Sequence, residues 1–363
     1  MNKNIILSIL FIFSTGLIVS CSRPSDYMVF EEIRYVDTFP RTFSLNNGVE
    51  VDLESMDILG VNDFRIYDSL LILSTGDKEG LWSFLSLPDY RYLGKFLTLG
   101  QGPYEFYENP DIGQVKFFKK NGELFAGIYH FHKGKIYEMN IDESFKNNRL
   151  CIETVRDSLP LEIFNFVMID SSTFFCKELS SRETQQIRYM SVNGERITPS
   201  HFERLNLAKI REHEDYNILS TGTKYDSKNK FIVEMPAHLN YINMYSIDGS
   251  FQKTICIGKR LDNMDEIQDK NLRDRMDTFS DLRLFSRFWG VVFTNEMSHN
   301  WRERTRFSSI LLFDWNGDPL AQLNLNNFSQ VFDIDVVNGR LYTLDYMSDV
   351  FYKYDIREIL EKL

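Results

Sequence analysis

One seven-residue stretch of the chain, Ile242-Asn-Met-Tyr-Ser-Ile-Asp248, decides the expected fold because its pattern occurs six times. In each copy the fourth position is large and apolar or aromatic, the fifth is small or polar, and the sixth is apolar again. This alternation is typical of a β-strand that leads into a turn. The copies are Trp82–Pro88, Ile136–Asp142, Ile187–Asn193, Ile242–Asp248, Ile310–Asn316 and Phe351–Arg357.

Each copy has neighbours that extend the repeat. A second apolar run lies upstream of every copy, at Leu70–Leu73, Leu124–Ala126, Phe174–Cys176, Phe231–Val233, Val291–Phe293 and Leu341–Leu344. Three copies end in the dipeptides Asn193-Gly194, Asp248-Gly249 and Asn316-Gly317. These dipeptides indicate tight hairpins, because glycine tolerates the positive φ that such turns need.

The spacing of the copies predicts the architecture. Successive copies start 54, 51, 55, 68 and 41 residues apart. Four antiparallel strands repeated six times predict an all-β fold, a six-bladed β-propeller with four strands per blade. A two-domain β-sandwich is the alternative, but it gives no reason for six copies.

The ends of the chain also suit a propeller. Only Glu358–Leu363 follow the last copy, which is too little for a good outer strand. We therefore expect an N-terminal strand, from Glu32–Val36 or Val49–Leu53, to complete the last blade and close the ring.

Two segments interrupt the repeat. Leu205–His213 and Asp262–Met276 are predicted to be short helices inserted between blades. In the second, Met264, Ile267, Gln268, Asn271, Leu272 and Met276 fall on one narrow face. Inserted segments often carry binding surface, although a charged helix can also be a solvated cover.

The composition is that of a folded, acidic protein. The chain has 363 residues, of which 43% are hydrophobic, and a formal net charge of −11. The charge argues against a nucleic-acid partner, whose phosphates would be repelled. Thirty Phe and eighteen Tyr favour strands, because flat rings pack well on a pleated surface.

The N-terminus predicts export. Lys3 precedes an apolar run, Ile5–Val19, that fits a signal peptide and is too short to span a membrane. Ile18-Val19-Ser20-Cys21 resembles the lipobox of bacterial lipoproteins, in which the cysteine is acylated and becomes the first residue. An uncleaved anchor and an ordinary secretion signal are the alternatives.

The lipobox sets the expected domain boundaries. Residues 1–20 are expected to be a lipoprotein signal peptide, residues 21–31 a lipid-anchored tether, and residues 32–363 the propeller. Acyl chains on Cys21 would hold the protein on a membrane. Ser22 does not resemble the aspartate that retains lipoproteins at the inner membrane, so we expect an outer-membrane, periplasm-facing lipoprotein.

Three cysteines remain after Cys21, namely Cys151, Cys176 and Cys256. At most one disulfide can form among them, and at least one thiol stays free. Each cysteine lies in an apolar, strand-like context, so we interpret all three as buried small hydrophobic residues.

The chain contains no strong catalytic motif, and we expect no cofactor. Asp314–Asp318 begins like a calcium loop but lacks the later glutamate, so it is interpreted as a hairpin turn. His130 and His132 are weak metal candidates, because alternate residues of a strand project from one face. The sequence names no third ligand, and solvent-facing histidines are the alternative.

The most distinctive local segment follows the first copy of the repeat. It consists of Gly100, Gln101, Gly102, Pro103, Tyr104, Glu105 and Phe106. Two glycines and a proline require an unusual tight path. The loop is predicted either to connect two blades, with Phe106 in the core and Glu105 capping backbone amides, or to contact a ligand.

This segment also carries a family resemblance. Gly100-x-Gly102-Pro103-x-Glu105-Phe106 resembles the signature of TolB-like six-bladed propeller lipoproteins of Bacteroidota. The resemblance extends from the lipobox to the last blade and implies fold and location more than activity. The second position is often arginine in that family and is Gln101 here, which weakens an anion-binding role for the loop.

These observations predict a non-enzymatic binding or scaffolding module for a peptide, protein or glycan at the cell envelope. One alternative is a propeller hydrolase or lyase that acts on a glycan or peptide, with polar residues converging on the channel. Another is a purely structural subunit of an envelope complex.

Overall fold

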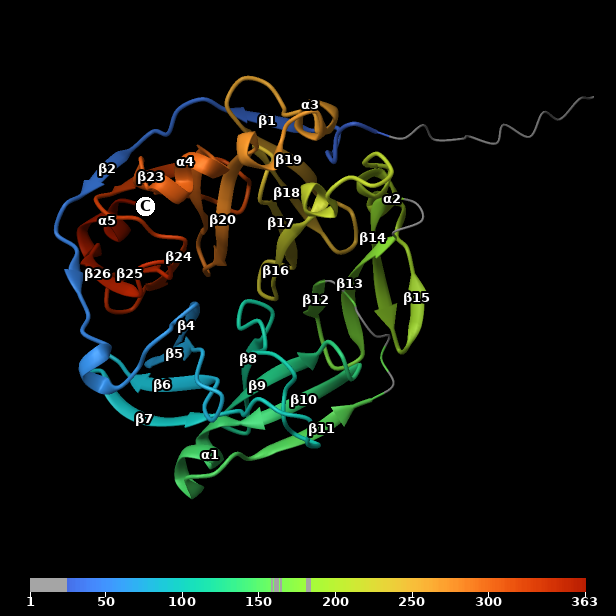
Figure 1. The fold of residues 1–363 in the computed structure, drawn as a ribbon. Coiled ribbons are helices and arrows are strands. Elements are labelled where there is room, and N and C mark those ends of the chain that lie inside the picture. The colour runs from blue at the N-terminus through green and yellow to red at the C-terminus, as the bar shows by residue number, and fades with distance from the viewer. Residues whose placement is uncertain (1–24, 158, 160–162, 164, 181–183) are drawn as a thin grey trace, which may run out of the picture.

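The computed structural model describes residues 25–363, except 158, 160–162, 164 and 181–183. Its strands form six sheets arranged in a ring around a central axis (Figure 1). The protein is therefore a six-bladed β-propeller, as the repeat predicts.

Blades 1 to 3 contain four strands each. Blade 1 consists of β4 (Asp63–Tyr67), β5 (Leu70–Ser74), β6 (Trp82–Ser86) and β7 (Arg91–Phe96). Blade 2 consists of β8 (Lys116–Lys120), β9 (Glu123–His130), β10 (Lys135–Asn140) and β11 (Ile152–Arg156). Blade 3 consists of β12 (Asn165–Met168), β13 (Thr173–Ser180), β14 (Gln185–Val192) and β15 (Glu195–Ile197).

Blades 4 to 6 are completed by strands from the N-terminal segment. Blade 4 contains β16 (Thr221–Asp226), β17 (Phe231–Pro236), β18 (Tyr241–Ser246) and β19 (Gln252–Ile257). Blade 5 contains β20 (Met276–Leu284), β21 (Trp289–Met297), β22 (Ser309–Phe313) and β23 (Pro319–Leu325). Blade 6 contains β24 (Val331–Asp335), β25 (Arg340–Asp345) and β26 (Val350–Asp355).

The N-terminal segment runs around the outside of these three blades (Figure 1). Strand β1 (Ile33–Val36) pairs parallel with β19, and β2 (Thr42–Leu45) pairs parallel with β23. Strand β3 (Val49–Glu50) pairs antiparallel with β26 and supplies the fourth strand of blade 6. Of the two expected closing segments, Val49–Leu53 therefore closes the ring, whereas Glu32–Val36 adds a fifth strand to blade 4.

The repeated seven-residue pattern falls on the third strand of every blade, and the upstream apolar runs fall on the second strands. At the fourth position of the pattern, Leu85, Met139 and Tyr245 are fully buried. The hydrophobic cores lie between adjacent blades. Across the closure, for example, the rings of Phe64 and Phe351 meet edge to face, 4.8 Å apart.

The hairpin interpretation of Asp314–Asp318 is confirmed. The Asp314 carboxylate accepts hydrogen bonds from the backbone amides of Asn316 at 2.9 Å and Asp318 at 2.8 Å. Gly317 adopts a φ of +79° in this turn between β22 and β23.

Helices are few and short in the described part of the chain. The α-helices are α1 (Ile141–Asn147), α2 (Ser200–Asn206), α3 (Met264–Gln268), α4 (Ser298–Glu303) and α5 (Arg357–Lys362). The 3-10 helices are η1 (Glu54–Met56), η2 (Tyr216–Leu219) and η3 (Leu272–Asp274). None of the described helices is long and apolar enough to cross a membrane.

The two predicted helices lie between blades, as expected, but their bounds were wrong. Helix α2 ends at Asn206 because the chain then turns to pair with Ser25, whose amide donates to the Leu207 carbonyl at 3.0 Å. In the second segment only α3 and η3 are helical. The expected apolar face does not continue, since Leu272 is 55% exposed.

The expected signal peptide and Cys21 lie outside the described residues. Within the expected tether, the chain is packed on the propeller from Ser25 onward. Met28 and Phe30 are fully buried. The Phe30 amide donates to the Thr254 hydroxyl at 2.8 Å, and the Asn243 side chain donates to the Met28 carbonyl at 2.8 Å.

Cys151, Cys176 and Cys256 are free thiols. Cys176 and Cys256 are buried, and burial raises the pKa of each to about 12. The expectation of burial was wrong for Cys151, which is only partly buried because it precedes the edge strand β11.

Ring closure yields a stability prediction. The amide of buried Val51, directly after β3, donates to the Phe351 carbonyl at 2.8 Å. Val51→Pro removes this donor and leaves a buried carbonyl unpaired. It should lower the unfolding free energy by about 1–3 kcal/mol beyond Val51→Ala, which keeps the amide, in denaturant titrations. Equal losses for the two variants would contradict the closing role.

Candidate functional site

The loop Gly100–Phe106 connects blades 1 and 2, and hydrogen bonds within the loop hold its shape. The Gly100 amide donates to the Phe106 carbonyl at 2.8 Å, and the Gly102 amide donates to the Glu105 carboxylate at 2.7 Å. A side chain at Gly100 would overlap that carboxylate. Phe106 is 2% exposed.

Blade 2 fixes the same loop from the other side. Lys133 Nζ donates to the carbonyls of Gly102 at 2.7 Å and Glu105 at 2.8 Å. The Tyr137 hydroxyl donates to the Pro103 carbonyl at 2.9 Å. These bonds favour the structural interpretation. Contact with a ligand stays a prediction for the three side chains of the loop that are exposed, Gln101, Pro103 and Tyr104.

The two histidines do not share a strand face as expected. His130 ends β9 and is 3% exposed, with its ring stacked on Phe106. His132 lies in the following turn, 3.3 Å from the Glu108 carboxylate. Burial, helped by Lys133, lowers the pKa of His130 to about 4. No group of three or more His, Cys, Asp or Glu side chains among the described residues could hold a metal ion.

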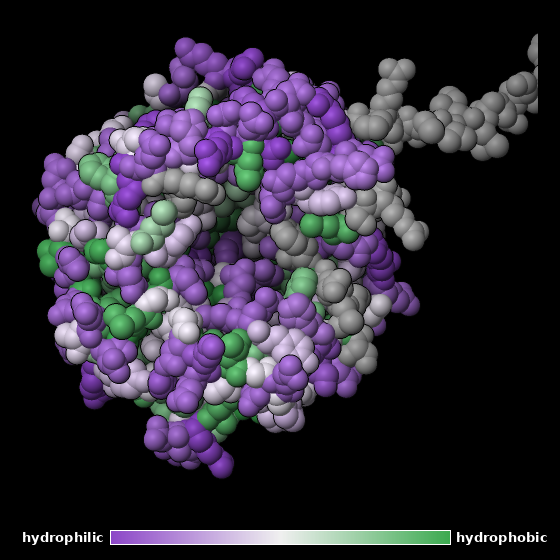
Figure 2. Space-filling view, viewed as in Figure 1, coloured by the Kyte–Doolittle hydropathy of each residue, from purple (hydrophilic) through white to green (hydrophobic). Residues whose placement is uncertain are grey.

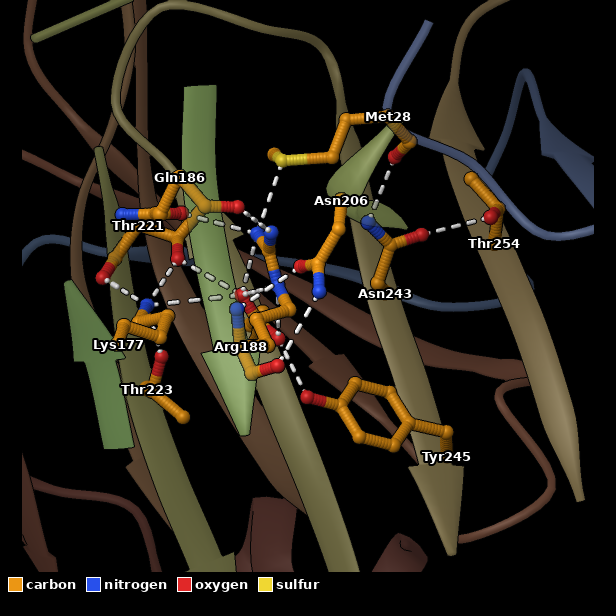
Figure 3. A network of polar contacts seen from close by, with 11 residues as sticks. Met28, Lys177, Gln186, Arg188, Asn206, Thr221, Thr223, Asn243, Tyr245 and Thr254 are labelled. Atoms are coloured by element: carbon orange, nitrogen blue, oxygen red, sulfur yellow. Dashed lines mark hydrogen bonds and ion pairs between the residues drawn. The ribbon is translucent and has the colours of Figure 1, made fainter. Parts of the chain in front are cut away.

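Glu234 on β17 bonds to Lys177, Arg188, Thr221 and Tyr245 in a polar network between blades 3 and 4. Figure 3 shows these four partners. Its side chain and those of Arg188 on β14 and Lys177 on β13 are fully buried. Arg188 donates to both carboxylate oxygens, from Nε at 2.8 Å and Nη2 at 2.9 Å. The Tyr245 hydroxyl also donates to Glu234.

Lys177 completes this network. Its Nζ lies 3.5 Å from Glu234 and donates to the Thr221 carbonyl at 2.9 Å and to the Thr223 hydroxyl at 2.5 Å. Figure 3 shows Met28 beside Arg188, so the N-terminal segment covers the network. Its charged groups have partners and no exposed surface, so the network stabilises the contact between blades and offers no ligand site.

The pKa values in the network follow from its geometry. Burial alone would raise the pKa of Glu234, but Arg188 and Lys177 outweigh burial and hold it at about 2. Burial lowers the pKa of Lys177 to about 7, although Glu234 favours its charged form. One carboxylate cannot fully compensate two buried cations, and Arg188 holds the better geometry.

A second ionic cluster joins blades 5, 6 and 1 around Arg283 on β20. Its Nη1 lies 3.1 Å from Asp281, its Nη2 donates to Asp63 at 2.8 Å, and its Nε donates to the Phe332 carbonyl at 2.8 Å. Arg283 is 1% exposed. This cluster lies among the innermost strands β20, β24 and β4, whereas the charged residues of the Glu234 network lie on second and third strands.

Arg65 and Asp333 extend the second cluster, with Nε and Oδ2 3.9 Å apart. The cluster then holds three carboxylates and two guanidinium groups. Burial raises the pKa of Asp281 to about 6, against the attraction of Arg283. An excess carboxylate in a place of low dielectric explains this direction.

The channel stays open at a cavity of about 210 Å³, which we call the channel pocket. Its walls come from β4, the start of β8 with the segment before it, and the ends of β12, β16 and β20, and hence from five blades. Figure 2 shows a hollow at the centre of the ring that is bordered largely by hydrophilic residues. The charged lining residues are Arg65, Lys116, Lys224 and Asp226.

The two lysines of the channel pocket are bonded to backbone carbonyls. Lys116 Nζ donates to the Ile169 carbonyl at 2.8 Å, and Lys224 Nζ donates to the Gly113 carbonyl. Burial lowers the pKa of Lys116, and it lowers the pKa of Lys224 to about 8. Tyr67 and Tyr225 add aromatic rings with hydroxyl groups to the wall.

None of these pocket residues was predicted as a site residue. Lys116 lies within a run that the sequence marks only as a strand, and Lys224 follows no motif. The one available signal is a charged residue inside an inner strand, and it does not single out the pocket, because β8 alone contains three lysines.

Comparisons with known proteins add little to this description. No family model matches the chain, and no curated protein matches it. An inferred exported protein of Bacteroides fragilis has 11% identity, with 89% of this chain and 98% of that chain covered, at a TM-score of 0.46. Hydrazine synthase of Kuenenia stuttgartiensis has 11% identity, with 86% and 80% covered, at a TM-score of 0.45.

The network around Glu234 yields a second stability prediction. Glu234→Gln leaves two buried cations without a counter-charge and should lower the unfolding free energy by about 3–5 kcal/mol. Glu178→Gln is the matched control, because Glu178 pairs with Arg196 at 2.6 Å on the exposed side of blade 3. The control should lose less than about 1 kcal/mol in the same denaturant titration. Similar losses would show that the buried network does not hold the blades together.

Proposed function

We propose that this protein is an outer-membrane, periplasm-facing lipoprotein whose propeller binds a ligand without transforming it. The lipobox Ile18–Cys21 and the apolar run before it support the anchor. The resemblance of Gly100–Phe106 to TolB-like propeller lipoproteins supports the same location.

The observation that carries the binding proposal is the channel pocket. Five blades, from Arg65 in the first to Leu284 in the fifth, supply its wall. Ligand sites are typically concave and place a few polar groups on a rigid frame. A head group or single residue of a peptide, protein or glycan fits the cavity, and the rest of such a ligand would lie over the mouth.

The ionisable groups of the channel favour binding over hydrolase or lyase chemistry. Arg65 keeps its positive charge, and the ammonium groups of Lys116 and Lys224 each donate to a backbone carbonyl, an acceptor that favours the protonated form over the free base. Lys177, whose pKa of about 7 would suit a general base, is fully buried in the closed network.

The anchor can be tested with cysteine variants. Cys21→Ala should abolish incorporation of labelled palmitate and move the protein from the membrane pellet to the soluble fraction. Cys151→Ala, at another accessible cysteine, should behave like the wild type. A Cys21→Ala protein that stays in the pellet after a carbonate wash would overturn the lipoprotein proposal.

The binding site can be tested by blocking the channel pocket. Ser227 lines the pocket and is exposed, so Ser227→Trp should fill its mouth with little loss of stability. Native mass spectrometry of protein purified from envelopes should find a bound small molecule or fragment in the wild type and not in Ser227→Trp. Ser55→Trp, which adds the same ring on exposed η1, should retain it.

Two results would count against this proposal. Equal retention in Ser227→Trp, or no bound species in the wild type, would remove the channel pocket as the site. Chemical conversion of the bound species by the wild type would overturn the non-enzymatic part alone.

A further inference from the structure

We propose that the channel pocket binds an anionic head group, a carboxylate, sulfate or phosphate, between Lys116 and Lys224. The inference rests on the proposed function, because it names the ligand class of the same site. It is argued from the unused hydrogen-bond donors, the balance of charge and the size of the cavity.

The two ammonium groups have unused donors. An ammonium carries three N–H donors. Within the described residues, Lys116 Nζ has one protein acceptor, the Ile169 carbonyl, and Lys224 Nζ also has one, the Gly113 carbonyl. No described carboxylate oxygen lies within the 4.0 Å ion-pair distance of either nitrogen.

Other buried cations of the propeller have carboxylate partners, unlike Lys116 and Lys224. Arg188 and Lys177 share Glu234, and Arg283 is paired with Asp63 and Asp281. Uncompensated charge in a partly desolvated place is unfavourable unless a counter-charge is supplied. An anion bound in the channel pocket would supply it for Lys116 and Lys224.

The carboxylates near the channel pocket are held by other groups. Asp226, which lines the pocket, accepts a hydrogen bond from the Asn229 amide at 2.5 Å. Asp111 accepts from the Gly113 amide and from the Gln114 side chain, each at 2.8 Å. Arg65 also lines the pocket but pairs with Asp333, so, among the described residues, the cations of the lining without a carboxylate partner are Lys116 and Lys224, which favours an anion in an otherwise acidic protein.

The volume limits the size of the bound group. About 210 Å³ corresponds to roughly seven waters at about 30 Å³ each. An oxyanion with a short polar stem fits this space, and Tyr67 and Tyr225 can contact the stem.

Calorimetric titration with matched sugars tests the inference. Glucuronate and glucose share a ring and differ in the carboxylate, so the wild type should bind glucuronate and not glucose in low-chloride buffer. Sulfate and phosphate, titrated separately, should displace glucuronate from the wild type, and the stronger competitor identifies the preferred head group.

Lysine variants locate the anion. Lys116→Gln and Lys224→Gln should each weaken glucuronate binding by about ten- to a hundredfold, because each removes a charged donor. Lys228→Gln is the matched control, since Lys228 is exposed on the same β16–β17 hairpin and does not line the pocket. Thermal unfolding of each variant checks that the fold is intact.

The pH dependence provides a measurement that needs no variant. Burial, with Arg283 and Arg65, lowers the pKa of Lys224 to about 8, against Asp111 and Asp281. The ammonium is charged below that pH and neutral above it, so sulfate affinity should be highest below about pH 8 and fall as the pH rises further. Lys224→Gln should flatten this profile.

The outcomes separate the inference from the proposed function. Glucose binding as tightly as glucuronate, and lost in Ser227→Trp, would keep the channel site and overturn the anion. Unchanged affinity in both lysine variants, or a flat pH profile in the wild type, would also overturn it. If none of the probes binds and no envelope ligand depends on Ser227, both proposals fail.

Discussion

The pairing of β3 with β26 turns six sheets into a closed ring. It joins Val49 to Lys353 and Glu50 to Tyr352, across about 300 residues of sequence. Closing a loop of that length costs about 5 kcal/mol in chain entropy by the logarithmic estimate. A two-residue strand could hardly offset that alone. Strands β1 and β2 also help to offset this entropy cost, because they hold the N-terminal segment along blades 4 and 5 before it reaches blade 6.

A closed ring also determines how its charges are arranged. Side chains that stay ionised where blades pack together need partners from neighbouring blades. Glu234 supplies a partner between blades 3 and 4, and Arg283 does so among blades 5, 6 and 1. The channel pocket lies between these two closed clusters, and there Lys116 and Lys224 have carbonyl oxygens as acceptors. The pocket therefore differs from the two clusters in the partners of its cations, which are carbonyl oxygens in the pocket and carboxylates in the clusters.

The repeat predicted the architecture because the third strand of each blade buries its large side chains between neighbouring blades, which imposes the same pattern six times. The closing strand was one of two expected segments, since both have strand-like composition and only the register with β26 decides between them. Helix bounds failed where tertiary pairing overrode local pattern, as when the residues after Asn206 pair with Ser25. The residues of the channel pocket could not be predicted from local sequence patterns. Arg65, Lys116 and Lys224 come from three different blades, and no local rule brings them together.

The point at which the described chain begins has a consequence for orientation. Ser25 is bridged to Ala208, and Figure 1 places this start at the outer edge of the ring beside α2 and α3. Four peptide steps separate Ser25 from Cys21, and a chain spans at most about 3.3–3.6 Å per residue, so the two residues can be at most about 14 Å apart. A lipid on Cys21 would therefore attach the propeller to the bilayer by a short segment at its outer edge. The central axis of the propeller would then lie parallel to the membrane. Both ends of the channel would then face parallel to the bilayer, and the membrane would cover neither of them.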